Sequence, residues 1–448
     1  MQGVLICVLL YTVAVLLLGA SITAGIFVFH VAVVPLIFKY SKTFRRHLIF
    51  ANFVQWPLNV DFDDLKASGV EGGRNFNIEY KSKVDNCDIK IGVWHILPKS
   101  AYEKLKGNFE SNTDKEELNR LMDSELTDSK YPVMLYCHGN SNSRATSHRV
   151  QIYKFFQQMD YHTVAFDYRG YGDSTNVTPS EDGVVEDALI VYDWLHTTVD
   201  KAPSRPPIFI WGHSLGTGIS SHLLGNLGKL STNILERPKP LPLPNGLILE
   251  APFNNLEDEV HYHPLAKLVS WLPYFESTFV SPFVACRVHA FRSDEHLARA
   301  PHLPALLLHA RDDRIVPHVV GHKVTVCVCL CTTRPRCCCT RATTASCRTS
   351  SATSSTAPCW SPAPPAVRPS SYILMKKRKT WGTNGSASPK ISLKSLANSF
   401  RIIDEKLLNF VKIHASAISR GWKVLLHIVY IDWNKIFQSN LFFFLSYK

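Results

Sequence analysis

Residues 208–218 read Ile-Phe-Ile-Trp-Gly-His-Ser-Leu-Gly-Thr-Gly, which places a G-x-S-x-G motif directly after a run of apolar residues. The apolar run has the length of a buried strand, and the residues after Ser214 are able to start a helix. Glycines on both sides of Ser214 permit the sharp turn that lifts a hydroxyl clear of a sheet, and the following helix points its N–H dipole at the same spot. This context predicts that Ser214 is a nucleophile; the alternative is a serine that only caps the helix.

Outward from this motif, strands and helices alternate along the chain. Further short apolar runs, typical of buried parallel strands, lie at residues 133–137, 163–166, 247–249 and 305–309. Segments with helical spacing lie between them, at residues 150–159 and 184–196. The pattern predicts an α/β fold with a mostly parallel sheet and helices on both faces. Upstream, the alternation over residues 76–96 predicts two antiparallel strands, and the polar residues 104–130 are interpreted as a loop or insertion.

An acyl-transfer site also needs N–H donors for the oxyanion, and an open parallel sheet gathers its chemistry at the carboxyl ends of its strands. Leu215 follows the nucleophile and supplies the first N–H group. The turn His-Gly-Asn-Ser-Asn at residues 138–142 follows the strand 133–137, and it is predicted to supply the second through Asn140 or Ser141. The turn is also what a glycine at a positive dihedral angle would produce without any catalytic role.

The remaining triad members on this type of fold follow the serine in the order acid, then histidine. Asp313, preferred over Asp312, lies in the loop after the strand 305–309 and is predicted to be the acid; the alternative is a solvated acidic turn. The downstream histidines are His318, His322, His414 and His427. The first two are too close in sequence to return to Ser214, and the last two lie in a segment that does not resemble a final strand and loop. No base is therefore assigned, and its loss would lower turnover by several orders of magnitude.

Charge and cysteine are both concentrated near the C-terminus. The chain has 448 residues and a net charge of +12, but residues 324–448 hold 18 Lys and Arg against 3 Asp and Glu, whereas residues 1–323 hold 31 against 34. The basic character belongs to the tail, and no nucleic-acid partner is predicted. Eight of the twelve cysteines lie between Cys327 and Cys359 without paired C-x-x-C spacing or interleaved histidines. That spacing argues against a zinc site, so no metal or cofactor is predicted.

The N-terminus is strongly apolar. Residues 3–38 contain no Asp, Glu, Lys or Arg, and about 20 such residues suffice to cross a bilayer. Residues 1–39 are predicted to be a retained transmembrane anchor, because a signal peptide has a positive start and a shorter apolar core; cleavage near residues 19–24 is the alternative. The basic residues that follow at once are Lys39, Lys42, Arg45 and Arg46. The positive-inside tendency would place the rest of the chain in the cytosol.

Together these motifs resemble one family, the membrane-anchored α/β-hydrolase domain-containing protein 12 group of monoacylglycerol and lysophosphatidylserine lipases. The resemblance covers residues 46–323. It rests on the sequences at residues 48–54, 91–95, 138–140, 166–174, 211–218, 249–253 and 308–313.

The resemblance implies a serine hydrolase of the α/β-hydrolase fold that cleaves the single acyl ester of monoacylglycerols and lysophospholipids. Ser214 and Asp313 stand at the positions of the family nucleophile and acid. Family members are integral proteins of the endoplasmic reticulum membrane with a lumenal catalytic domain. This conflicts with the positive-inside expectation, and the family pattern is preferred because four charges are a bias and not a rule.

Two segments of this domain have both a structural and a functional interpretation. Residues 167–174, Asp-Tyr-Arg-Gly-Tyr-Gly-Asp-Ser, are interpreted as a turn whose Asp and Arg fix a loop and not as an acidic site. Residues 256–300 form an insert before the acid. Its apolar residues, Trp271, Leu272, Tyr274, Phe275, Phe279, Val280 and Phe283, suit either a lid over an acyl chain or ordinary packing.

The resemblance ends at residue 323, and the composition of the tail, residues 324–448, predicts disorder. The apolar runs 424–430 and 441–445 match no element that the fold lacks. Three readings are open: a translated wrong frame or intron, which the abrupt change favours, an alternative isoform, or a basic tail for an anionic membrane. If the final strand and its histidine are absent, the rival to the hydrolase is a catalytically silent α/β-hydrolase scaffold.

Overall fold

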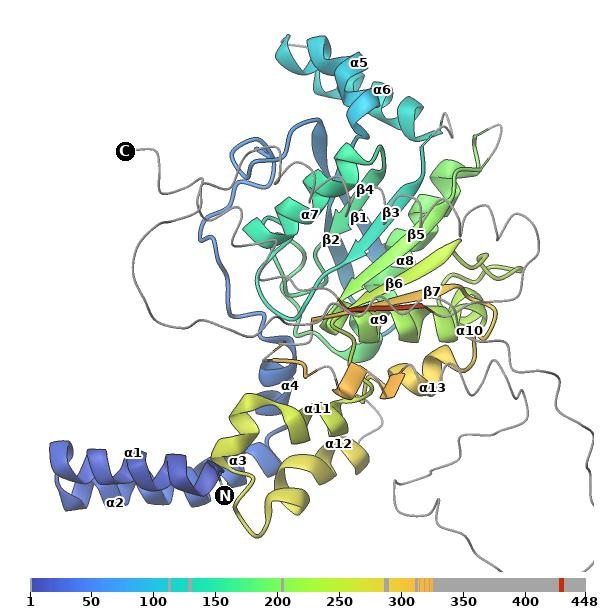
Figure 1. Cartoon of the computed structure of the whole chain (residues 1–448). Helices are drawn as coiled ribbons and strands as arrows, with labels where there is room; N and C mark the ends of the chain where they lie inside the picture. The colour runs from blue at the N-terminus through green and yellow to red at the C-terminus, as the bar shows by residue number, and fades with distance from the viewer. Residues whose placement is uncertain are drawn as a thin grey trace, which may run out of the picture. The chain divides into compact units, whose positions relative to one another are not determined.

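The computed structural model describes residues 2–111, 114–127, 131–202, 205–285 and 290–310, then residues 313, 315–317, 319–321 and 323–324, and the backbone of residues 427–430. Within these residues an eight-stranded sheet has the order β1-β2-β4-β3-β5-β6-β7-β8 (Figure 1). The strands are β1 (Gly73–Lys81), β2 (Asp88–Ile96), β3 (Val133–Cys137), β4 (His162–Phe166), β5 (Ile208–His213), β6 (Gly246–Glu250), β7 (Ala305–His309) and β8 (His427–Tyr430). β1 and β2 are antiparallel, and β3 to β8 are parallel to one another. The predicted fold class is confirmed.

The register of the central strands brings their carboxyl ends together. Cys137, the last residue of β3, pairs with Gly212 in β5, and His213 pairs with Glu250, the last residue of β6. Glu250 pairs in turn with Leu308 of β7. The loops after β3, β5, β6 and β7 therefore leave the sheet side by side, which is why residues far apart in sequence can share one site.

Helices cover both faces of the sheet. On one face, Phe156 of α7 (Ser147–Gln158) contacts Trp211, with ring centroids 5.2 Å apart. On the other, Gly212 lies against α9 (Leu215–Gly225), which packs on α8 (Glu181–Val199). Adjacent strand residues point to opposite faces, so α7 and α9 must lie on opposite sides. α10 (Leu227–Asn233) follows α9, and α13 (Ser293–Leu297) directly precedes β7.

The interpretation of residues 104–130 as a polar loop is wrong. They contribute to helices α5 (Lys99–Glu110) and α6 (Lys115–Thr127). In α6 the apolar residues recur every three or four positions, and Met122 packs with Leu105 and Leu97 in a small separate core. Polar composition hid an amphipathic period, because a helix that buries only one stripe can be polar elsewhere.

The predicted N-terminal anchor is helical, but it is not one continuous helix. Gly19, with φ +82°, separates α1 (Gln2–Leu18) from α2 (Ala20–Val28), which continues through a π-helical turn, η1 (Phe29–Val33), into α3 (Val34–Tyr40). Residues 20–40 contain an 18-residue window with a mean hydropathy of 2.2 and are long and apolar enough to cross a membrane. An apolar N-terminal helix fits a membrane anchor, although a signal sequence has the same character. Helix α4 (Lys42–Phe50) then leads to the sheet.

Between β6 and β7 the chain forms a set of short helices, here called the cap and defined as residues 256–285. Its elements are α11 (Leu256–Tyr262), η2 (Pro264–Leu268), η3 (Glu276–Val280) and α12 (Ser281–Ala285). Leu272, Phe275 and Phe279 are buried and belong to the main apolar core. Ordinary packing therefore accounts for these side chains, and a lid function of the cap is left as a proposal.

One part of the tail does add to the sheet. The expectation that residues 424–430 match no element of the fold is wrong for β8. This strand pairs in parallel with β7, from Leu306 opposite His427 to His309 opposite Tyr430. Branched and aromatic residues in Ile-Val-Tyr suit an edge strand, whatever the origin of the segment. The predicted disorder of residues 324–448 otherwise concerns positions outside the described residues.

Candidate active site

Ser214 occupies a strained turn between β5 and α9. Its backbone has φ +50° and ψ −115°, a conformation that residues with a side chain rarely adopt. Two backbone hydrogen bonds hold it there: Ser214 N–H donates to Glu250 O at 2.9 Å, and Thr217 N–H donates to Ser214 O at 2.8 Å. The serine side chain is only half-buried. This is the geometry predicted from the G-x-S-x-G sequence, and it leaves the hydroxyl accessible to a substrate.

Close backbone contact explains the glycines around Ser214. A Cβ atom on Gly216 would lie 2.0 Å from the carbonyl oxygen of Cys137, and a Cβ atom on Gly212 would lie 2.5 Å from the carbonyl oxygen of Gly216. Both obstacles are backbone atoms that cannot swing aside. The first turn of α9 can lie against the end of β3 only because these positions lack side chains.

Gly216→Ala is therefore expected to displace α9 from β3 and to slow labelling of Ser214 by a fluorophosphonate probe on the order of 10²-fold, the usual effect of misplacing a reacting atom by about 1 Å. The matched control is Gly228→Ala in α10, where an added Cβ meets nothing within 4 Å. Labelling rates and thermal melting of both variants, measured in detergent, provide the check. Equal labelling of the two variants would contradict the packing argument.

The loop after β3 lies beside the nucleophile. A Cβ atom on Gly139 would lie 3.2 Å from Nδ1 of His213, the residue before the serine. The buried Arg149 guanidinium donates to the carbonyl oxygens of Ser141 at 2.5 Å, Ser143 at 2.7 Å and Gly139 at 3.3 Å. The carbonyl and N–H groups of one peptide unit point in opposite directions, so fixing the Gly139 carbonyl also fixes the N–H group of Asn140. The carbonyl of Asn140, whose peptide unit carries the N–H group of Ser141, accepts a hydrogen bond from the Tyr171 hydroxyl at 3.1 Å. Their role as oxyanion donors with Leu215 stays a prediction.

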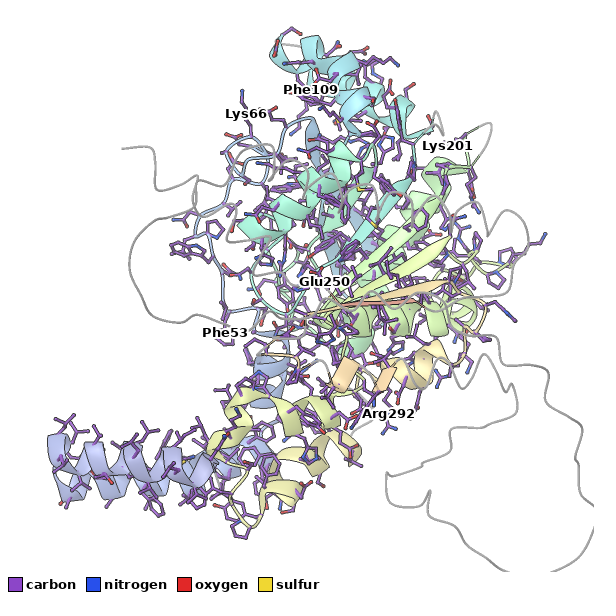
Figure 2. All side chains as sticks on the ribbon, in the orientation of Figure 1. Phe53, Lys66, Phe109, Lys201, Glu250 and Arg292 are labelled. Atoms are coloured by element: carbon purple, nitrogen blue, oxygen red, sulfur yellow. The ribbon has the colours of Figure 1, made fainter. Side chains whose placement is uncertain are left out.

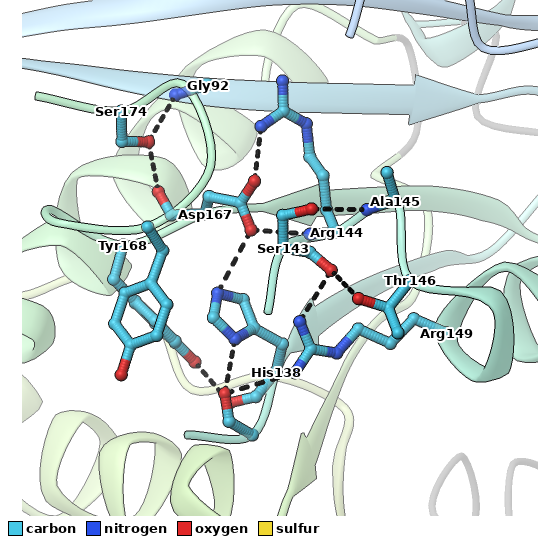
Figure 3. A network of polar contacts seen from close by, with 12 residues as sticks. Gly92, His138, Ser143, Arg144, Ala145, Thr146, Arg149, Asp167, Tyr168 and Ser174 are labelled. Carbon is cyan, nitrogen blue, oxygen red and sulfur yellow. Dashed lines mark hydrogen bonds and ion pairs between the residues drawn. The ribbon is translucent and has the colours of Figure 1, made fainter. Parts of the chain in front are cut away.

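A buried ionic network of Arg144, Asp167 and Asp173 holds the loop that follows β3 (Figure 3). Arg144 Nη1 donates to Asp167 Oδ2 and to Asp173 Oδ1, both at 2.6 Å, and the backbone N–H of Arg144 donates to Asp167 Oδ1 at 2.7 Å. His138 Nε2 lies 3.3 Å from Asp167 Oδ1. Burial raises the pKa of the Asp167 carboxyl group, and Arg144 opposes the rise. These contacts support the structural interpretation of residues 167–174.

Asp313 lies just beyond the carboxyl end of β7 and is held by its own loop. Its Oδ1 accepts hydrogen bonds from the backbone N–H groups of Ile315 at 2.9 Å and Val316 at 3.0 Å. β7 is two strands from β5, or about 10 Å, which leaves room for an imidazole between Asp313 and Ser214. Asp312 lies outside the described residues. The assignment of Asp313 as the acid agrees with this placement and stays a prediction.

Two half-buried carboxyl groups near Asp313, those of Glu250 and Glu259, were not singled out as site residues in the sequence. Burial is the main reason that the pKa of Glu250 is raised to about 7. The hydrogen bond that Trp211 Nε1 donates to Glu250 at 2.8 Å lowers this pKa, and the nearby Asp313 raises it. Burial, together with Asp313, raises the pKa of Glu259 to about 8. Figure 2 shows Glu250 at the carboxyl edge of the sheet. Its position at the end of a predicted strand was the one available signal.

No described histidine is placed as the base. His427 is the first residue of β8 and lies about 10 Å from the carboxyl end of that strand, while His318, His322 and His414 lie outside the described residues. His309 Nε2 contacts the carbonyl oxygen of Val316 at 2.7 Å. Desolvation of the half-buried His213 lowers its pKa to about 4; Arg149 lowers this pKa further, and Asp313 raises it.

Within the described residues one group has the composition of a metal site: Glu181, His222 and His296, whose ligand atoms lie within 4.8 Å of one another. His222 Nδ1 contacts Glu181 Oε1 at 2.7 Å, and the two imidazole rings are stacked, with centroids 4.1 Å apart. Asn226 Nδ2 donates to His296 Nδ1 at 2.9 Å, so the proton of His296 is on the nitrogen that faces Glu181. Hydrogen bonds thus account for the cluster as it stands.

Comparison with known proteins agrees with this geometry. A family model described as the alpha/beta hydrolase fold matches residues 132–234, which include Ser214 and the loop after β3. Lysophosphatidylserine lipase ABHD12 of Xenopus tropicalis is 36% identical over 292 residues, or 65% of this chain and 67% of the relative. Protein ABHD12B of Homo sapiens is 31% identical over 293 residues, or 63% of this chain and 72% of the relative.

Among solved structures, a Pyrococcus furiosus esterase, Pf2001, matches at 18% identity and a TM-score of 0.38; the match covers 61% of this chain and 83% of the esterase. The chain spans about two thirds of the length of the curated relatives that it matches.

Proposed function

This chain belongs to the ABHD12 family of α/β-hydrolases, and from that premise we propose that it cleaves the single acyl ester of lysophospholipids, lysophosphatidylserine above all, and of monoacylglycerols. One observation carries the proposal. Ser214 stands on the strained turn at the carboxyl edge of the sheet, next to the first N–H groups of α9 and to the loop that Arg149 holds in place.

In the proposed reaction the Ser214 hydroxyl attacks the carbonyl carbon of the ester. The N–H groups of Leu215 and of Asn140 or Ser141 stabilise the negative charge that develops on the carbonyl oxygen. The lysolipid head group or glycerol leaves as an alcohol, and water then releases the fatty acid from the serine. Asp313 orients the imidazole that moves the proton, a group that the described residues do not supply.

The lack of an assigned base among the described residues supports a second candidate, a catalytically silent scaffold of the same fold. Among the described residues, His309 Nε2 lies 3.8 Å from Asp313 Oδ2 but contacts the carbonyl oxygen of Val316, and no imidazole is hydrogen-bonded to the Ser214 hydroxyl. Without a base the serine keeps its position and its oxyanion donors but loses most of its nucleophilicity.

Membranes from cells that express the chain should release oleic acid from oleoyl lysophosphatidylserine and from monooleoylglycerol faster than membranes from cells that express Ser214→Ala. The two hydrolysis rates are measured by fatty-acid release under identical lipid presentation. Folded protein that hydrolyses neither lipid would support the silent scaffold. Hydrolysis of short soluble esters alone would contradict the lipid assignment and leave the serine hydrolase intact.

We also propose the endoplasmic reticulum membrane as the location, with the catalytic domain in the lumen, as the family resemblance implies. Asn176, in the sequence Asn-Val-Thr, is exposed and provides a reporter of this location, because N-linked glycans are added only on the lumenal side.

A further inference from the structure

The apolar N-terminal segment folds back on itself at Gly19. Tyr11 of α1 contacts Phe27 of α2 with ring centroids 5.3 Å apart, and the Tyr11 hydroxyl contacts Nδ1 of His30. Figure 1 shows α1 and α2 side by side. Gly19 takes the φ of +82° that the reversal requires, at a point where an added Cβ would meet nothing within 4 Å. Residues 2–40 therefore form a hairpin and not a single rod.

The beginning of the hairpin returns to the cap of the catalytic domain. A Cβ atom on Gly3 would lie 2.2 Å from the carbonyl oxygen of Lys267, and Cys7 Sγ lies 3.5 Å from the carbonyl oxygen of Leu268. His30 Nε2, from the other arm, contacts the same Leu268 oxygen at 3.0 Å. Both arms thus meet the cap at one place, and the N-terminus of α1 lies on the same side as the catalytic domain.

The hairpin is apolar along its length, and its tip has no charged group. Near the tip, Leu16 is 79% exposed and Leu17 is 76% exposed, and no Asp, Glu, Lys or Arg occurs between residues 3 and 38. So large a continuous apolar surface requires a nonaqueous partner. The opposite end carries Lys39, Tyr40 and the cap residue Trp271, the residue types that settle at the boundary between lipid and water.

The cap continues the apolar surface of the hairpin. Phe38 of α3 packs on Phe279 of the cap with ring centroids 4.8 Å apart, and the Tyr274 hydroxyl contacts the carbonyl oxygen of Val31. On the outside of the cap, Leu265 is 62% exposed. Because the cap and the hairpin pack against each other, insertion of the hairpin into a membrane also brings the cap to the membrane surface.

From these contacts we infer that the hairpin enters a phospholipid bilayer from one side only, with the N-terminus and the catalytic domain on that same side and the cap at the lipid surface. Helix α1 has 17 residues and is about 25 Å long, somewhat less than a hydrocarbon core of about 30 Å. Its tip ends among acyl chains and has no charged group to reach the far head groups. A single-pass anchor, by contrast, places the N-terminus across the membrane from the catalytic domain.

Glycosylation mapping in microsomes tests the inference. In an Asn384→Gln background, which removes the sequon in the tail, a flexible N-terminal extension that carries an Asn-Gly-Thr acceptor is added to the full chain. If Asn176 is glycosylated, the added acceptor is expected to be glycosylated as well, and the chain should show two endoglycosidase-sensitive shifts in gel mobility. If neither site is glycosylated, both the N-terminal extension and the catalytic domain must be cleaved by protease added to intact vesicles. Asn176→Gln identifies which shift belongs to the domain. One site inside and the other outside would overturn the inference.

The contact with the cap has its own test. In Leu268→Cys a short bismaleimide is expected to bridge Cys7 and the new thiol within one chain in membranes, and Leu268→Cys combined with Cys7→Ser is the control. Peptide mass spectrometry identifies the bridge. Same-side topology without this bridge would overturn the packing of the hairpin on the cap. Neither readout depends on hydrolytic activity, so failure of the proposed function leaves this inference standing.

Discussion

Replacing Ser214 with alanine is expected to abolish covalent labelling of the full chain by a fluorophosphonate probe. The probe reacts with a serine hydroxyl that is activated and faces oxyanion donors, and the turn with φ +50° presents Ser214 next to the first amides of α9. Where nucleophile, base and acid act as a unit, loss of the nucleophile lowers turnover on the order of 10⁶-fold. In-gel fluorescence after a timed incubation measures the effect.

Ser124→Ala is the control, because Ser124 is exposed on α6, outside the site. It should label as the parent chain does. Labelling that persists in Ser214→Ala would show that the probe reacts with a different residue. If the folded parent protein is not labelled, the Ser214 turn can still be present, and the result would favour the silent scaffold. The described residues contain no imidazole placed as the base of Ser214.

Arg144→Met is expected to have the largest effect on stability, lowering the free energy of unfolding by about 3–5 kcal/mol. The substitution keeps the volume but leaves Asp167, which is fully buried, and Asp173, which is 28% exposed, without their counter-ion. Domains of this kind have a total stability of about 5–15 kcal/mol, so much of the protein should unfold at growth temperature. Urea unfolding in detergent, followed by tryptophan fluorescence, measures the change.

Two further variants test the cause of that effect. Arg144→Met with Asp167→Asn removes the stranded charge as well and should recover part of the stability, because an uncompensated buried ion costs more than an absent pair. Arg205→Met breaks a pair with Asp200 whose side chains are 38% and 51% exposed, and it should change stability by less than about 1 kcal/mol. Equal losses for Arg144→Met and Arg205→Met would show that burial does not control these ion pairs.

Local patterns were sufficient for most of the sheet and for the turn that carries Ser214. A buried strand needs a short apolar run, and a strand-to-helix turn needs glycines where backbones touch, so β5, Ser214 and Gly216 could all be located from neighbouring residues. The same approach misjudged α6, where composition was given more weight than the spacing of Leu118, Leu121 and Met122.

The sequence by itself determined the α/β-hydrolase fold, the turn that carries Ser214 and the apolar N-terminus, because each depends on residues within a few positions of one another. Only the tertiary structure decided which carboxyl groups surround Asp313, that Arg149 orients the loop of Asn140, and that the first helix folds back onto the cap. Those features depend on contacts between residues up to about 260 positions apart, such as Cys7 and Leu268. No local pattern encodes such pairs, because the sheet register and the packing of whole helices bring them together.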